Sequence, residues 1–97
     1  MSYKLTKSTN KNKKYTVITP LGKRISFGAI GYSDYTIHRD PERQKRYITR
    51  HRSRENWNKS GINTAGFWSR WILWNKPSLQ GSINDTSRRF GIKISKS

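Results

Sequence analysis

Aromatic and β-branched residues dominate residues 15–19, and a second short segment with apolar side chains follows at residues 23–27. Residues 20–22 are Pro-Leu-Gly, which favour a turn, so the two segments predict a β-hairpin. Residues 32–38 alternate between polar and apolar side chains and predict a short third strand, and residues 92–94 predict a last one. The sheet is therefore expected to be small, either the hairpin alone or three strands.

The sequence Asp40-Pro41-Glu42 predicts the start of a helix. Asp40 provides an acceptor for the helix N-terminus, proline suits the first helical position, and the Glu42 carboxylate interacts favourably with the helix dipole. We expect this helix to extend over residues 40–55. Its weakly apolar stripe consists of Tyr47, Ile48 and His51, and most of its other positions are basic.

A second predicted helix carries most of the large apolar residues. Thr64 caps its N-terminus, Pro77 follows its end, and its apolar residues lie at helical spacing. These residues are Phe67, Trp68, Trp71, Ile72, Leu73 and Trp74. A third helix is predicted from the cap Ser78 to a stop at Gly91. Its apolar face consists of Leu79, Ile83, Thr86 and Phe90.

These elements predict an α+β fold in which the small sheet packs on the Trp-rich helix and the basic helix lies outside. One domain, residues 15–97, accounts for them, since 97 residues supply one hydrophobic core at most. Residues 1–14 contain five Lys and no acidic residue, with Tyr3 and Leu5 as their sizeable apolar side chains. This composition predicts a flexible basic arm, because it cannot bury enough surface to offset chain entropy.

The net charge of the chain narrows the possible functions more than its hydrophobic pattern does. The chain has 21 Lys and Arg against 5 Asp and Glu, a formal net charge of +16 and a pI near 10.9. Self-repulsion of this size opposes compaction, so an anionic partner is expected. The chain has no Cys, which excludes disulfides and Cys-based zinc sites. We expect no membrane span and no signal peptide, because no apolar run approaches roughly 20 residues and the start is Lys-rich.

The candidate polyanion-binding residues are basic side chains of the arm, the basic helix and the third helix. Arg dominates the basic helix, where a planar guanidinium grips a phosphate at two points, and Lys dominates the arm as a mobile charge. The candidates are Lys4, Lys7, Lys11, Lys13, Lys14, Arg39, Arg43, Lys45, Arg46, Arg50, Arg52, Arg54, Arg88 and Arg89. The alternatives are a solvated basic face without a dedicated partner and an acidic protein surface as the partner. Charge alone does not distinguish DNA, RNA and such a surface.

The four Trp residues offer a further binding chemistry, because single-strand binders stack bases on aromatic side chains. Three of them, Trp68, Trp71 and Trp74, belong to one predicted helix in a chain with few other large apolar residues, so core packing is favoured. Tyr32 and Tyr35 lie close to two glycines and are better candidates for exposed aromatic residues, although packing explains them equally well.

The enzyme hypothesis is a metal-dependent nuclease. Its candidate ligands and bases are His38, His51, Asp34, Asp40, Glu42 and Glu55. Such a site needs a convergent cluster of carboxylates, whereas the helix start already explains Asp40 and Glu42. The sequence shows no nucleophile–base pair and no glycine-rich phosphate loop. We therefore expect a non-enzymatic protein with no catalytic residue, no metal, no cofactor and no small-molecule substrate.

Four segments of the chain carry a resemblance to known proteins. They are YTVITPLGK at residues 15–23, ISFGAIGYSDYTIHRD at 25–40, RHRSRENW at 50–57 and TAGFWSRWILWNKPSL at 64–79. They are similar to a family of small basic proteins from nucleocytoplasmic large DNA viruses. The resemblance implies a setting, either the virion or the cytoplasm or nucleus of the infected host cell, and implies no mechanism. The basic arm lies outside the similar region.

Our first hypothesis is a virion protein that binds the double-stranded DNA genome through phosphate contacts that are largely independent of sequence. The alternative is a minor capsid protein that bridges acidic surfaces of capsid subunits, and an ordered arm would favour this alternative. The nuclease is the third hypothesis. The sequence does not decide the oligomeric state or the position within a particle.

Overall fold

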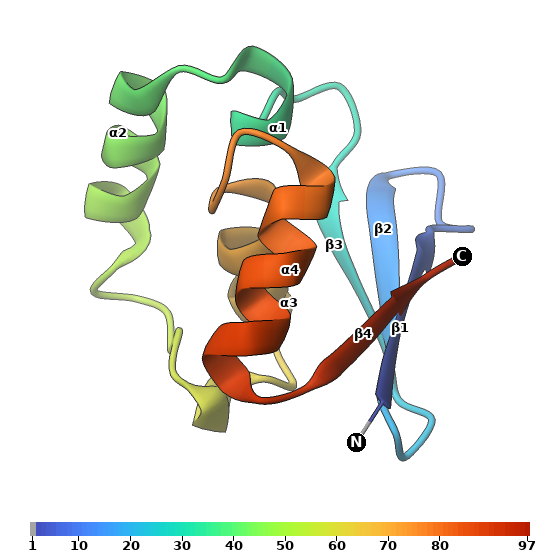
Figure 1. Ribbon diagram of the computed structural model, residues 1–97. Helices are drawn as coiled ribbons and strands as arrows, with labels where there is room; N and C mark the ends of the chain where they lie inside the picture. Colours follow the sequence, from blue (N-terminus) through green and yellow to red (C-terminus); the bar gives the residue numbers. More distant parts are fainter. Residues whose placement is uncertain (1) are drawn as a thin grey trace.

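The computed structural model describes residues 2–97, and Met1 lies outside the described residues. The fold is α+β, as predicted, and consists of a four-stranded mixed sheet with helices packed against it (Figure 1). The strands are β1 (Ser2–Lys7), β2 (Lys13–Ile18), β3 (Arg24–Ala29) and β4 (Lys93–Lys96). The helical elements are α1 (Tyr35–His38), α2 (Pro41–His51), the 3-10 turn η1 (Lys59–Gly61), α3 (Ala65–Trp68), the π-helical turn η2 (Ser69–Leu73) and α4 (Leu79–Phe90).

The sheet has the strand order β3-β2-β1-β4. The predicted hairpin is confirmed as the antiparallel pair β2–β3, and β1 is antiparallel to β2 and parallel to β4. Val17 lies opposite Leu5 on one side and Ile25 on the other, so these apolar side chains share the sheet face that is covered by helices. The opposite face of the sheet is polar next to these residues: the hydroxyls of Thr16 and Ser26 are hydrogen-bonded at 2.9 Å.

The prediction of a flexible basic arm over residues 1–14 is wrong for residues 2–7, which form β1 between β2 and β4. Tyr3 and Leu5 alternate with polar residues and are 6% and 0% exposed. Two apolar side chains are enough to hold residues 2–7 in the sheet, because β2 and the helices supply the rest of the hydrophobic core that Tyr3 and Leu5 enter. Residues 13 and 14 also belong to a strand, and residues 8–12 form the turn that connects β1 to β2.

The third strand predicted over residues 32–38 is also wrong, because residues 35–38 form helix α1. Asp34 caps this helix: its side chain accepts hydrogen bonds from the backbone N–H and the hydroxyl of Thr36. A local cap of this kind favours a helical turn over an extended conformation. The start of α2 at Pro41 is confirmed, with the Asp40 side chain accepting from Glu42 N, but α2 ends at His51 rather than near residue 55.

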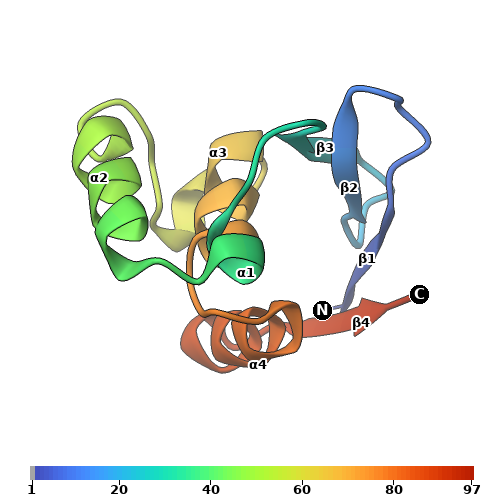
Figure 2. The same ribbon diagram turned by 90° about the horizontal axis from the view of Figure 1, so that it is seen from above.

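The Trp-rich segment packs between the sheet and α2, as Figures 1 and 2 show. It consists of α3 and the π-helical turn η2, in which Trp71, Ile72 and Leu73 are all buried. Three consecutive buried residues are possible because this segment has neighbours on several sides. The predicted core role is confirmed for Trp68 and Trp71, whose indole N–H groups donate to backbone carbonyls at 2.7 and 3.0 Å.

The remaining elements close the fold around this core. Helix α4 starts after the Ser78 cap and ends at Gly91, as predicted, and leads into the parallel edge strand β4. Within residues 2–97, no helix is long and apolar enough to cross a membrane.

Candidate nucleic-acid interface

Helix α2 lies on the outside of the molecule and is held by one face only. The rings of Tyr47 and Trp74 stack with their centroids 4.5 Å apart and their planes at 5°, and His51 stacks on the same tyrosine at 4.5 Å. The Gln44 side-chain amide donates to the backbone carbonyls of Trp74 and Asn75 at 2.9 and 2.8 Å. This stack and these hydrogen bonds fix the rotation of α2, and therefore which side chains point outward.

The face of α2 beside the docked one carries Arg43, Arg46 and Arg50, spaced i, i+3 and i+7. All three side chains are exposed, and within residues 2–97 none of them forms an ion pair with a carboxylate. We call these three residues the Arg stripe. Seven residues of helix span about 10 Å, so the stripe presents three guanidinium groups along a line of that length.

The Arg stripe forms one wall of a pocket of about 460 Å³, which we call the Arg groove. The end of β3 and the β3–α1 loop form another part of its lining, and β2, α2 and η2 with Trp74 supply the rest. Besides the stripe, the groove is lined by Lys14, Gly28, Ala29, Tyr32, Ser33, Asp34, Tyr47, His51, Ser69, Leu73 and Trp74. The groove is therefore concave, rich in unpaired positive charge and bordered by aromatic rings.

Two residues lining the Arg groove already neutralise each other. Lys14 Nζ lies 2.6 Å from Asp34 Oδ2, and their side chains are 14% and 2% exposed. Lys14 was a candidate polyanion contact, but the structure uses its charge to join β2 to the start of α1. The net positive charge of the groove therefore comes from the Arg stripe.

Arg88 and Arg89 lie on α4, apart from α2 (Figure 2). Both interact with Asp85, at 3.5 and 3.3 Å, and the Arg89 guanidinium lies over the Trp71 ring at 4.6 Å. The pKa of Asp85 is lowered, mainly by the hydrogen bond from the Asn75 amide and then by Arg89 against an opposing effect of burial. These two arginines thus have partners within the chain and are not brought to the Arg groove.

Arg70 was not among the predicted contacts, and the structure gives it an internal role. Its guanidinium lies 4.4 Å from the Trp71 ring centroid and 5.4 Å from that of Trp57, and it donates to the Trp74 carbonyl at 2.9 Å. Burial lowers the pKa of this arginine from its ordinary value. It braces the Trp-rich segment beneath α2.

The other predicted cations lie outside the Arg groove. Lys4 and Lys7 are on β1, Lys11 is in the β1–β2 turn, Lys13 starts β2, Lys45 is on α2, and Arg52 and Arg54 follow α2. Arg39 ends α1 in a left-handed conformation with φ 55° and donates to the Pro77 carbonyl at 3.1 Å. Strand β1 and helix α2 lie on opposite sides of the molecule in Figure 1, so the structure does not gather all candidates on one surface.

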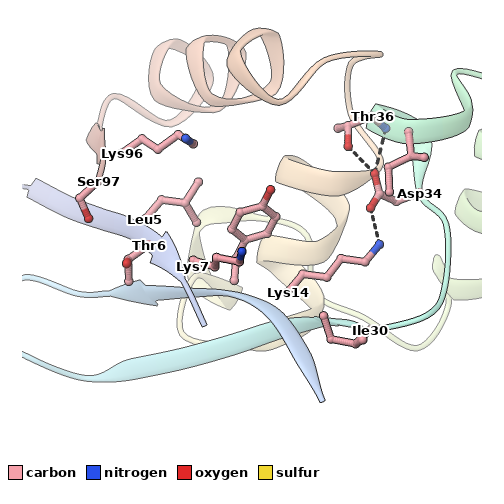
Figure 3. Close-up of a pocket in the computed structure, with 11 residues that line it drawn as sticks. Leu5, Thr6, Lys7, Lys14, Ile30, Asp34, Thr36, Lys96 and Ser97 are labelled. Carbon is pink, nitrogen blue, oxygen red and sulfur yellow. Dashed lines mark hydrogen bonds and ion pairs between the residues drawn. The ribbon is translucent and has the colours of Figure 1, made fainter. Parts of the chain in front are cut away.

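A second pocket, of about 430 Å³, lies on the other side of the Lys14–Asp34 pair (Figure 3). Leu5 and Tyr15 line it from the sheet, and the exposed side chains of Ile30 and Ile37 line it from the β3–α1 loop and α1. Lys7 and Lys96 add positive charge. Burial and then the charge of Asp34 raise the pKa of the Tyr15 hydroxyl. This pocket combines apolar and cationic groups, in contrast to the Arg groove.

Three of the six candidate ligands of the nuclease hypothesis have partners within the protein. Asp34 pairs with Lys14, Asp40 caps α2, and His38 Nδ1 accepts a hydrogen bond from Asp40 N at 2.9 Å. Over residues 2–97, no three His, Asp or Glu side chains gather in a way that could hold a metal ion.

Sequence reasoning missed the loop side of the Arg groove. Tyr32 and Ser33 were predicted to be part of a strand, so their place in the lining of the Arg groove could not be predicted. The available signal was the pair of glycines before them, because Gly28 and Gly31 adopt φ of +79° and +90°, a conformation that favours glycine and interrupts a strand. The sequence left exposure and packing open for Tyr32 and Tyr35, and the structure separates them: Tyr32 is 75% exposed, whereas Tyr35 is half-buried.

A family model matches residues 3–51, about half of the chain. The chain belongs to the Family of unknown function (DUF5754). The DUF5754 match contains residues 3–7 of β1, the β3–α1 loop and the Arg stripe, whereas the Trp-rich segment and α4 follow it. No curated protein and no solved structure matches the chain.

Proposed function

We propose that this protein is a non-enzymatic DNA-binding protein that contacts the phosphates of double-stranded DNA through the Arg groove, largely independently of sequence. The observation that carries the proposal is the Arg stripe. Its three arginines are exposed, unpaired within residues 2–97 and aligned on one wall of a concave surface. Guanidinium groups bind phosphate oxygens in a bidentate manner, and phosphate contacts supply affinity without reading the bases.

The dimensions and charge of the stripe support this proposal. Its length of about 10 Å covers about three phosphates of one strand, which follow each other at 3.4 Å along the duplex axis. The helix that carries it is fixed by the Tyr47–Trp74 stack, so its backbone needs no reordering on binding and only the arginine side chains lose freedom. The net charge of +16 attracts a polyanion over a longer range.

The biological setting is a further part of the proposal and rests on the sequence resemblance alone. The DNA would be the genome of a large DNA virus, and the protein would belong to the virion or to the cytoplasm or nucleus of the infected cell. A minor capsid protein that bridges acidic capsid surfaces is the second candidate. It is favoured by the pocket in Figure 3, where the exposed Ile30 and Ile37 suit a protein partner better than DNA.

The order of β1 does not decide between these candidates. We expected an ordered N-terminal segment to favour the capsid protein, because a partner would then hold it. In the structure, β1 is paired on both sides by strands of the same chain, so its order requires no partner.

The experiment is a titration of duplex DNA at several salt concentrations. The variant Arg43→Gln/Arg46→Gln/Arg50→Gln is compared with Arg24→Gln/Lys59→Gln/Lys93→Gln, which removes the same charge at exposed positions outside the groove. We expect the first variant to lower the slope of log affinity against log salt by about 2.7, at about 0.9 for each lost phosphate contact. The second variant should retain most of the slope.

Two results would contradict the proposal. If the wild-type protein has no affinity for duplex DNA at about 50 mM salt, the DNA-binding function is wrong and the capsid candidate is left. If the two variants lose equal affinity, the binding is a property of the overall charge and the Arg groove is not the site.

A further inference from the structure

Tyr32 lies in the β3–α1 loop and lines the Arg groove together with the Arg stripe. It is 75% exposed, and within residues 2–97 it takes part in no aromatic pair. By contrast, Trp57 and Trp74 are half-buried beside other rings. A large ring left in contact with water beside a pocket suits the binding of another flat apolar group.

The loop that carries Tyr32 is fixed at both ends. Ile30 N donates to the Asn12 carbonyl at 3.1 Å, and Tyr32 N donates to the Ala29 carbonyl at 3.4 Å. On the other side, Asp34 is held by the Lys14 ion pair and caps α1. The ring therefore projects from a braced turn, and stacking on it would cost little conformational entropy.

We propose that the Arg groove binds single-stranded nucleic acid, with one unpaired base stacked on Tyr32 and the adjacent phosphates on the Arg stripe. This inference rests on the proposed function and adds a second class of ligand, a single strand, to the duplex that the same arginines bind. A pocket of about 460 Å³ lies within the size range of small-ligand sites, so it has room for one nucleotide. Ser33 lines the same pocket, and a serine hydroxyl both donates and accepts hydrogen bonds, so it does not select a particular base.

A base within a duplex does not reach Tyr32 in the same way. Its faces are covered by neighbouring bases, and extruding it costs a few kcal/mol. The duplex therefore contacts the arginines alone, whereas a single strand contacts the arginines and the ring. Stacking on a protein aromatic contributes about 1–3 kcal/mol per base, which corresponds to about fivefold to a hundredfold in affinity.

The test compares a fluorescein-labelled oligothymidylate with a duplex of equal length, by anisotropy at fixed salt. Tyr32→Ala should lower the affinity for oligothymidylate by about fivefold to a hundredfold and change duplex affinity by less than about twofold. Tyr32→Trp should restore single-strand binding, because it returns an aromatic face. Leu21→Ala is the control, since Leu21 is 97% exposed in the β2–β3 turn and lies outside the groove.

The proposal is overturned if Tyr32→Ala leaves oligothymidylate affinity unchanged, or weakens both ligands equally. It is also overturned if the wild-type protein binds duplex DNA but not oligothymidylate, while the proposed function then stands. If neither ligand binds, the proposed function itself fails. Circular dichroism of each variant shows whether the fold is retained, and Tyr32→Trp separates loss of stacking from loss of folding.

Discussion

Lys14 Nζ lies 2.6 Å from Asp34 Oδ2 and joins the second strand of the sheet to the cap of α1. The same pair lines the Arg groove on one side and the pocket of Figure 3 on the other. Asp34 Oδ1 also accepts from Thr36 N at 2.9 Å, so one buried carboxylate fixes both the ion pair and the helix start. The position of the β3–α1 loop, and with it part of the lining of the Arg groove, depends on this contact.

Removing one partner of this pair should destabilise the protein strongly. Lys14→Met leaves the Asp34 carboxylate, 2% exposed, without its counter-ion, and losses of this kind cost about 3–5 kcal/mol. In the double variant Lys14→Met/Asp34→Asn no charge is left buried, and the amide oxygen still accepts from Thr36 N. Its free energy of unfolding should therefore exceed that of Lys14→Met. Urea unfolding of the four proteins of the cycle measures this coupling, and additive losses would show that the pair contributes nothing beyond its separate side chains.

Two glycines with similar backbone angles differ in what surrounds them. Gly28 has φ +79°, and a Cβ there would lie 2.7 Å from Leu73 Cδ1 and 3.2 Å from Lys14 Cβ. Gly22 has φ +87°, and a Cβ there would meet nothing within 4 Å. Both substitutions to Ala carry the strain of a left-handed conformation, about 1–2 kcal/mol.

Gly28→Ala should cost more than Gly22→Ala. Leu73 is 2% exposed and cannot move away freely, so the added methyl group brings an overpacking cost of about 1–3 kcal/mol on top of the strain. We expect a loss of about 3 kcal/mol for Gly28→Ala and about 1 kcal/mol for Gly22→Ala, measured by thermal or urea unfolding. Equal losses of unfolding free energy in the two variants would show that Leu73 moves aside for the added methyl group without an energetic penalty.

The sequence predicted correctly those helix ends that are set by capping residues next to them in the chain. Asp40 and Pro41 start α2, and Ser78 and Gly91 bound α4, because the groups that cap these helices are adjacent in sequence. The sequence also predicted that Trp68 and Trp71 belong to the core. It did not reveal that the segment contains a π-helical turn, since that turn follows from contacts on several sides.

The errors arose where distant partners decide the structure. Composition over residues 1–14 predicted an arm, but Tyr3 and Leu5 enter a core that is built by other elements. Asp34 was read as part of a strand, because nothing near it in sequence indicates that Lys14 is its partner. The Arg stripe could be predicted from helical spacing, whereas the groove could not, since the part of its lining that the β3–α1 loop forms depends on that ion pair.

The hydrogen bond that His38 accepts at the start of α2 depends on the protonation state of its imidazole, and therefore on pH. Its Nδ1 accepts from Asp40 N at 2.9 Å, its Nε2 is buried without a partner among residues 2–97, and its ring lies 5.3 Å from that of Trp74. Its pKa is lowered from the ordinary value of 6.5, first by burial and then by the charge of Arg43. Lys14 acts in the same direction, and Asp40 and Asp34 oppose it.

A lowered pKa in the folded state means that the unfolded chain binds more protons at mildly acidic pH. The stabilisation is therefore fully present above about pH 6.5 and is lost as the pH falls through the folded-state pKa. We expect a lower free energy of unfolding at pH 5.5 than at pH 7.5, measured by urea unfolding. His38→Asn should reduce this difference, because its side-chain oxygen accepts from Asp40 N at either pH. Asp85 does not interfere, since its pKa is lowered and its carboxylate stays ionised over this pH range, so an equal pH dependence in the variant would exclude His38 as the cause.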